Sequence, residues 1–136
     1  LYALRGTIAA GEVGRGMAFL KKYSQRRLLG DHVPYAIEAW PEGNQRHLSA
    51  ESGLYCRIYT EGLFGIRPTG LRSFEITPRL PQEWEFANLN RVRAFGADFD
   101  IQVKRAGGSK LAVTIVNGKK TIKKTISEGQ TITVRL

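Results

Sequence analysis

The sequence contains little cysteine or histidine, with one cysteine, Cys56, and two histidines, His32 and His47. A single cysteine excludes an internal disulfide bond and a thiolate metal centre. The two histidines have no third ligand at a suitable spacing, so we expect no metal site and no cofactor. Cys56 lies among apolar residues of a predicted helix, which favours a buried, unreactive thiol.

Long apolar runs are also missing, since no stretch approaches the ~20 apolar residues that a membrane-spanning helix requires. We therefore expect no membrane partner. A content of 42% apolar and 24% charged residues is typical of a folded protein, and 136 residues make one ordinary domain or two small ones. The sequence starts at Leu1 without a signal-peptide pattern, from which we expect a processed chain or a piece of a longer protein.

Acidic residues are scarce near the C-terminus, and this imbalance accounts for most of the net charge of +9. Residues 104–136 contain no aromatic residue and one acidic residue, Glu128, against eight basic ones: Lys104, Arg105, Lys110, Lys119, Lys120, Lys123, Lys124 and Arg135. A basic cluster can bind phosphate groups, but a single-strand binder also needs aromatic residues on which bases stack. We interpret the lysines as solvent-facing side chains that discourage edge-to-edge strand pairing, and we expect no nucleic-acid partner. Nucleic-acid binding remains a third alternative, marked by a steep dependence of affinity on salt.

Two segments of the N-terminal half carry apolar residues at helical spacing. Residues 7–29 hold Ile8, Val13, Met17, Leu20, Tyr23 and Leu28, and residues 49–62 hold Leu54, Tyr55, Ile58 and Tyr59. Ser49 is a suitable N-cap and Gly62 a suitable C-cap of the second helix. Gly11, Gly14 and Gly16 fit positions where another helix packs closely. Two helices cannot bury both of their sides on each other, so we expect further neighbours.

The apolar period changes to two in the C-terminal half. The alternating runs are Phe74 and Ile76; Phe99, Ile101 and Val103; Val113 and Ile115; and Ile132 and Val134. Glycine-containing pairs separate the runs, and Asn117-Gly118 is a strong signal for a two-residue hairpin. The pattern predicts an antiparallel sheet or sandwich, so the fold class is α+β with a boundary between residues 1–66 and 67–136.

The loop expected between the two helices has an unusual composition. Residues 36–47 read AIEAWPEGNQRH, which contains two glutamates, a tryptophan, an arginine and a histidine. A plain solvated loop has no need of these residues, and Trp40 belongs to neither apolar stripe. Carboxylates, an aromatic ring and hydrogen-bonding groups at one place indicate that the loop does more than connect the two helices.

In order of elements, the chain resembles the C-terminal end of six-hairpin glycoside hydrolases, the (α/α)6-barrel enzymes, and most of all their α-L-rhamnosidase-like branch. Glu38-Ala39-Trp40 looks like the Glu-x-Trp loop of that branch. HLSAESGLYCRIYTEGLFGI at 47–66 is similar to the last barrel helix and its exit turn. ITPRLPQEWEFANLNRVRAFGADFDIQV at 76–103 resembles the β domain that follows the barrel.

The resemblance implies that Glu38 is the general base that activates water in an inverting reaction. Trp40 would be a platform for the sugar, and Asn44, Arg46 and His47 would contact substrate hydroxyls. Glu42 is the second candidate for the base, because the family motif does not normally continue as Pro-Glu-Gly. Glu51, in the first turn of the second helix, is the third.

On this reading residues 1–66 are the last hairpin of the catalytic barrel and residues 67–136 are the C-terminal β domain. The partners are then a glycoside or oligosaccharide and the rest of the barrel, and the relatives favour a periplasmic or secreted location. The general acid is not recognisable here, so we expect the chain alone to be inactive and its uncovered helix faces to favour self-association. The alternative is a non-catalytic carbohydrate-binding or structural β-sandwich module.

Overall fold

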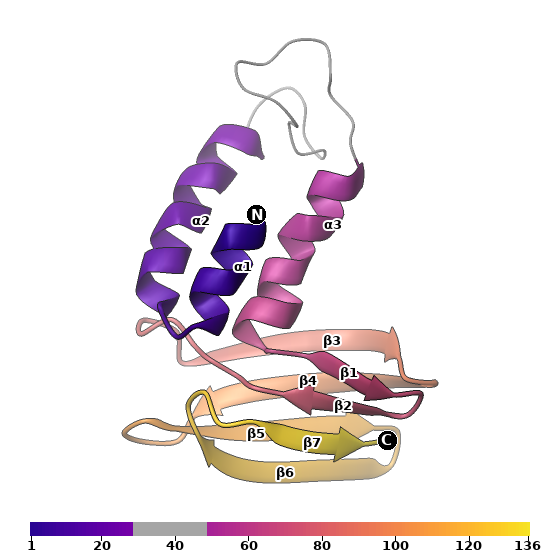
Figure 1. Cartoon of the computed structure of the whole chain (residues 1–136). Coiled ribbons are helices and arrows are strands. Elements are labelled where there is room, and N and C mark those ends of the chain that lie inside the picture. Colours follow the sequence, from indigo (N-terminus) through magenta and orange to yellow (C-terminus); the bar gives the residue numbers. More distant parts are fainter. Residues whose placement is uncertain (29–48) are drawn as a thin grey trace. The chain divides into compact units, whose positions relative to one another are not determined.

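The computed structural model describes residues 1–28 and 49–136. The described part contains helices followed by antiparallel strands, which confirms the α+β class (Figure 1). It divides into two compact units, Leu1–Gly62 and Leu63–Leu136. We call them the helical unit and the β unit, and we describe each by itself.

The helical unit begins with two helices, α1 (Tyr2–Ala9) and α2 (Val13–Arg27). The predicted single helix from Thr7 onward is therefore wrong. Gly11 has a φ of 100°, a backbone conformation that glycine adopts without strain, and it turns the chain between the helices. A Cβ atom on Gly16 would lie 2.5 Å from Cγ1 of the buried Ile8, so Gly16 allows α1 and α2 to pack closely.

The last helix of this unit, α3 (Ser49–Arg57), widens into a π-helical turn, η1 (Ile58–Leu63). In Figure 1, α2 and α3 run in opposite directions. The sequence predicted that the helix ends at Gly62, but the helical segment continues to Leu63. The glycine with left-handed geometry is Gly65, with a φ of 62°, two residues after η1. A Cβ atom there would overlap the carbonyl oxygen of Thr77, so glycine is required at this position.

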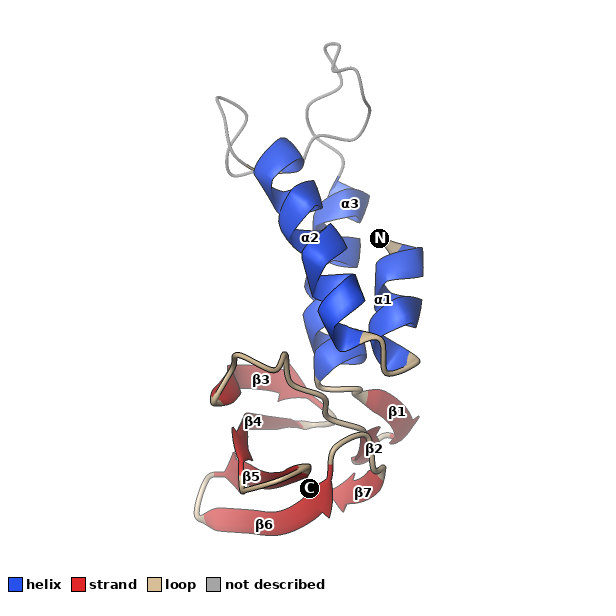
Figure 2. Ribbon diagram, turned by 90° about the vertical axis from the view of Figure 1, so that its left-hand side faces the viewer, coloured by secondary structure: helices blue, strands red, loops and turns tan. Residues whose placement is uncertain are grey.

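The β unit contains two antiparallel sheets (Figures 1 and 2). A three-stranded sheet has the order β1 (Arg67–Gly70), β2 (Ser73–Ile76), β7 (Ile132–Arg135). A four-stranded sheet joins neighbours in the sequence: β3 (Phe86–Ala94), β4 (Ala97–Arg105), β5 (Lys110–Asn117) and β6 (Lys120–Ser127).

The four alternating runs of the sequence are confirmed as β2, β4, β5 and β7. The predicted hairpin between β5 and β6 is present, but its two turn residues are Gly118, with a φ of 57°, and Lys119, whereas Asn117 is the last residue of β5. The turn between β3 and β4 places both Phe95 and Gly96 at positive φ, which is the geometry of a type I′ hairpin. Strands β1 and β3 were not predicted from the sequence, and β6 was implied only by the hairpin signal at Asn117-Gly118.

Aromatic side chains from the two sheets of the β unit contact one another in its core. The ring of Phe74, on β2, stacks on Phe99 of β4 and on Phe95 of the adjoining turn, with ring centroids 5.5 and 4.8 Å apart. Further buried apolar side chains come from both sheets and from the segment before β3: Ile76, Leu80, Ala87, Ile101, Val103, Leu111, Val113, Ile115, Ile126 and Val134. The face of β4 that carries Phe99 is therefore the face turned toward β2.

A polar clamp holds the proline-rich connector before β3. The Arg105 guanidinium donates hydrogen bonds to the carbonyl oxygens of Leu80 (3.2 Å), Pro81 (2.8 Å) and Trp84 (2.9 Å). Its Nη1 lies 3.6 Å from Oε2 of Glu128, whose Oε1 accepts a hydrogen bond from the backbone N–H of Leu80 (2.8 Å). One arginine and one glutamate thus fix the irregular segment to the sheet.

Candidate functional site

The residues predicted to form the site lie outside the described part of the chain. They are Glu38, Trp40, Glu42, Asn44, Arg46 and His47, and they fall in residues 29–48. The sequence places them between the end of α2 at Arg27 and the start of α3 at Ser49. Glu51 lies in the first turn of α3. What the structure does describe is how these two helices are joined to each other.

A group of hydroxyl-bearing side chains joins α2 to α3. The Ser24 hydroxyl lies 2.8 Å from the Tyr55 hydroxyl, which lies 2.9 Å from the Tyr59 hydroxyl. Ser24 also donates to the carbonyl oxygen of Leu20 at 2.7 Å. The ring of Tyr23 stacks on that of Tyr55 with centroids 6.1 Å apart. We call these four side chains, Tyr23, Ser24, Tyr55 and Tyr59, the hydroxyl cluster.

The hydroxyl cluster is suited to holding α2 and α3 together rather than to proton transfer. Burial, reinforced by the hydrogen bond between the Tyr59 and Tyr55 hydroxyls, raises the pKa of Tyr59 well above its ordinary value. Tyr59 therefore stays protonated near neutral pH and has no capacity to act as a general base there. Tyr23 and Ser24 lie one turn before the end of α2, so the cluster fixes the helix that leads into residues 29–48 against the helix that leads out of them.

Glu61 is a carboxylate that the helical unit uses for ion pairing. Its Oε2 lies 2.6 Å from Nη1 of Arg5 and 3.1 Å from Nη2 of Arg57, and its Oε1 also pairs with Arg57. The hydrogen bond from Arg57 lowers the pKa of Glu61 below its ordinary value. A general acid needs a raised pKa, so this carboxylate is unsuited to protonating a leaving group.

Cys56 is exposed, so the predicted buried thiol is wrong. The reason is the position of Cys56 on α3, where Tyr55 and Ile58 supply the inward-facing side chains instead. Among the residues that the structure describes, no group of three or more His, Cys, Asp or Glu side chains is placed to hold a metal ion. The described helices include none that is long and apolar enough to cross a membrane.

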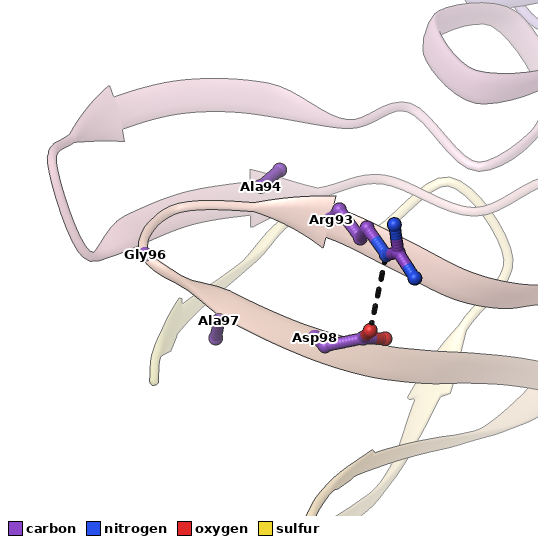
Figure 3. Close-up of a pocket in the computed structure, with 5 residues that line it drawn as sticks. All are labelled: Arg93, Ala94, Gly96, Ala97 and Asp98. Atoms are coloured by element: carbon purple, nitrogen blue, oxygen red, sulfur yellow. Dashed lines mark hydrogen bonds and ion pairs between the residues drawn. The ribbon is translucent and has the colours of Figure 1, made fainter.

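The tip of the β3–β4 hairpin borders an open hollow, lined by Arg93, Ala94, Gly96, Ala97 and Asp98 (Figure 3). Arg93 and Asp98 form an ion pair across the two strands, with Nε and Oδ2 3.3 Å apart. Both side chains are more than half exposed, and the rest of the lining consists of two methyl groups and a glycine. Such a surface offers neither an enclosed pocket nor converging polar groups, so it is a poor candidate for a ligand site.

Sequence reasoning missed the hydroxyl cluster because it assigned the tyrosines to apolar stripes. A signal was present, since Tyr55 and Tyr59 are four residues apart and so lie on one face of a helix. The Ser24 partner has no such signal, because its pairing depends on how α2 and α3 meet. Comparison of the chain with family models, with curated proteins and with solved structures found no match.

Proposed function

We propose that this chain is the C-terminal portion of a six-hairpin glycoside hydrolase whose parent cleaves a glycosidic bond by carboxylate acid–base chemistry. The supporting observation is the place of the Glu38-Ala39-Trp40 motif. It lies in the connection between two opposed helices, α2 and α3, ahead of an antiparallel β unit. In this proposal α2 and α3 are the last hairpin of the barrel, and the two sheets form a β-sandwich domain.

The proposed mechanism assigns the general base to Glu38 and the sugar platform to Trp40. A carboxylate in a loop at the mouth of a barrel can approach the anomeric carbon with a water molecule between them. Asn44, Arg46 and His47 carry the hydrogen-bonding groups that would orient sugar hydroxyls. The general acid would come from another part of the barrel. Within the described residues, Glu61 is held by two arginines and does not fit that role.

The test is substitution of Glu38 by glutamine in the parent enzyme, with Glu42→Gln as the matched control in the same loop. Loss of a general base is expected to lower kcat by about 10²–10⁴-fold and to leave KM nearly unchanged. Glu42→Gln should retain most of the turnover. The reverse result would assign the base to Glu42, and an equal small effect from both would remove the catalytic proposal.

The alternative function, a non-catalytic carbohydrate-binding module, predicts a different result from the same variants. Glu38→Gln and Trp40→Ala would then weaken sugar binding. Neither this chain nor the parent protein would hydrolyse a glycoside. The residue-1–136 chain alone is expected to be inactive on aryl glycosides under the enzyme proposal as well. Only the parent chain, with the sequence upstream of Leu1, separates the two functions.

A further inference from the structure

One face of the four-stranded sheet is turned away from the core. Successive side chains of a strand point to opposite faces, so the residues that alternate with Phe99, Ile101 and Val103 point away from β2. We call this the outer sheet face. One half of it contains no acidic residue. The strand register brings these residues of that half side by side: Phe86, Asn88, Gln102, Lys104, Lys110, Ala112, Thr114, Lys123 and Thr125.

Three exposed lysines gather on this half of the face. Lys104 of β4 pairs in register with Ala112 of β5, and Lys123 of β6 pairs with Thr114 of β5. Lys110 precedes Ala112 by two residues on the same strand. With neighbouring strands ~4.8 Å apart, the Cα atoms of all three lysines fall within about 15 Å of one another. Sequence spacing alone hides this grouping, since 104, 110 and 123 lie on different strands.

Among the described residues, no carboxylate pairs with Lys104, Lys110 or Lys123, although Glu85, which precedes Phe86 and lies opposite Arg105, is at the same end of the sheet. Strands β3 to β6 contain two acidic residues, Asp98 and Asp100, toward the other end of β4. Asp98 pairs with Arg93, and Asp100 accepts a hydrogen bond from the backbone N–H of Arg91. Glu128, beyond β6, is engaged by Arg105.

The groups beside the lysines are suited to sugars. Phe86 is 56% exposed and pairs in register with Lys104, so an aromatic side chain and a lysine occupy neighbouring positions on one face of the sheet. The adjacent row across the sheet runs Asn88, Gln102, Thr114 and Lys123, which are two amides, a hydroxyl and an ammonium. Aromatic rings pack on the C–H faces of sugars, and amides and hydroxyls bond to sugar hydroxyl groups.

We propose that the outer sheet face binds an acidic polysaccharide. The lysines would neutralise carboxylate or sulfate groups, while Phe86 and the amide row would contact the sugar rings. A nucleic acid fits less well, because this half of the face offers one exposed aromatic ring and no arginine for bidentate phosphate contacts. The proposal rests on charge and strand register in the β unit, so it stands whether or not Glu38 is catalytic.

The experiment measures binding of the residue-1–136 chain to polygalacturonate, with dextran as the neutral polymer and a single-stranded oligonucleotide as the competing polyanion. We expect binding to polygalacturonate that weakens as salt rises, and no binding to dextran. The variant Lys104→Gln/Lys110→Gln/Lys123→Gln should bind at least roughly tenfold more weakly, because it loses three exposed ion pairs with the carboxylates of the polymer. Phe86→Ala should weaken binding without changing its salt dependence.

The matched control removes three exposed lysines outside this face: Lys21→Gln/Lys22→Gln/Lys119→Gln. It changes the net charge by the same amount and should bind nearly as well as the unaltered chain. An equal loss in the control would mean that net charge alone attracts the polymer, which overturns the proposal. Absence of polygalacturonate binding at low salt, or tighter binding of the oligonucleotide at equal salt, would also overturn it. Single variants, above all Lys123→Gln, give the same comparison if the triple variant does not fold.

Discussion

The two units are stabilised in different ways. Among the described residues, the β unit buries fourteen apolar side chains, whereas the helical unit buries Ile8, Leu20 and Ile58. The helical unit instead joins its helices through the hydroxyl cluster and the Glu61 ion pairs. Burial of an apolar side chain contributes about 1.5–3 kcal/mol, and an exposed ion pair about 0–1 kcal/mol. We therefore expect the β unit to be the more stable one, and the following variants test this difference.

The largest effect is expected from Phe74→Ala, in the core of the β unit. Phe74 is fully buried and stacks on two other rings, so its truncation should cost about 3–5 kcal/mol of unfolding free energy. Denaturant unfolding measures the cost, and hydrogen exchange shows which unit opens. The exposed Phe86→Ala is the control and should change stability by less than about 0.5 kcal/mol. Similar costs for both would contradict the assignment of the core.

The next effect is expected from Gly16→Ala, at the contact between α1 and α2. The new methyl group would meet the buried Ile8, so the packing must shift at a cost of about 1–3 kcal/mol. Gly14→Ala, two residues earlier on α2, is a matched control, because nothing lies within 4 Å of its Cβ position. It should stabilise the helix by up to about 1 kcal/mol. Thermal unfolding followed by circular dichroism should show a lower melting temperature for Gly16→Ala and an equal or higher one for Gly14→Ala.

Arg105→Met tests whether the β unit also depends on a polar contact. The change removes three hydrogen bonds to the carbonyl oxygens of the connector and leaves Glu128 without its cation. We expect a loss of about 1–2 kcal/mol, with faster hydrogen exchange in the connector and slight change in β4 and β5. Arg93→Met, in an exposed pair, is the control and should have almost no effect. Equal effects would show that the clamp contributes no more than a surface pair.

The smallest effect is expected from acid acting on Glu61 in the helical unit. The pKa of Glu61 is lowered in the folded state, so its contribution is complete above its ordinary value near 4.5 and is lost as the pH falls through the folded-state value. The pair is partly exposed, which limits the contribution to less than about 1 kcal/mol. The stability difference between the unaltered chain and Glu61→Gln should shrink toward zero as the pH is lowered. A difference that does not change with pH would exclude the ion pair as its source.

The sequence predicted those parts of the fold that local patterns determine. Alternation located β2, β4, β5 and β7, because a half-buried strand must place apolar residues at every second position. Strand β6 was implied by the hairpin signal at Asn117-Gly118 and not by alternation, because five of its eight residues are lysine or threonine. Strand β3 was missed because a register shift between Leu89 and Val92 breaks its alternation.

Helix ends were harder to predict than helix interiors. Three glycines precede the middle of α2, and the sequence does not distinguish Gly11, which turns the chain, from Gly16, which permits close packing. Gly65 was missed as the helix-ending glycine because the π-helical turn extends the segment beyond Gly62. The motif in residues 36–47 is a prediction from composition and resemblance, and Glu38→Gln in the parent enzyme is its test.

The order of strands in the β unit sets the order in which it can be completed during synthesis. Strands β3 to β6 pair with their neighbours in the sequence, so each hairpin can form soon after it leaves the ribosome. Strand β2 instead pairs with β7, more than fifty residues later. Until residues 132–135 have been made, one edge of β2 has no partner. Phe74 and Ile76, which are buried in the complete chain, are then less well shielded from solvent. We therefore expect the unpaired edge of β2 to be open to pairing with another chain until β7 is available.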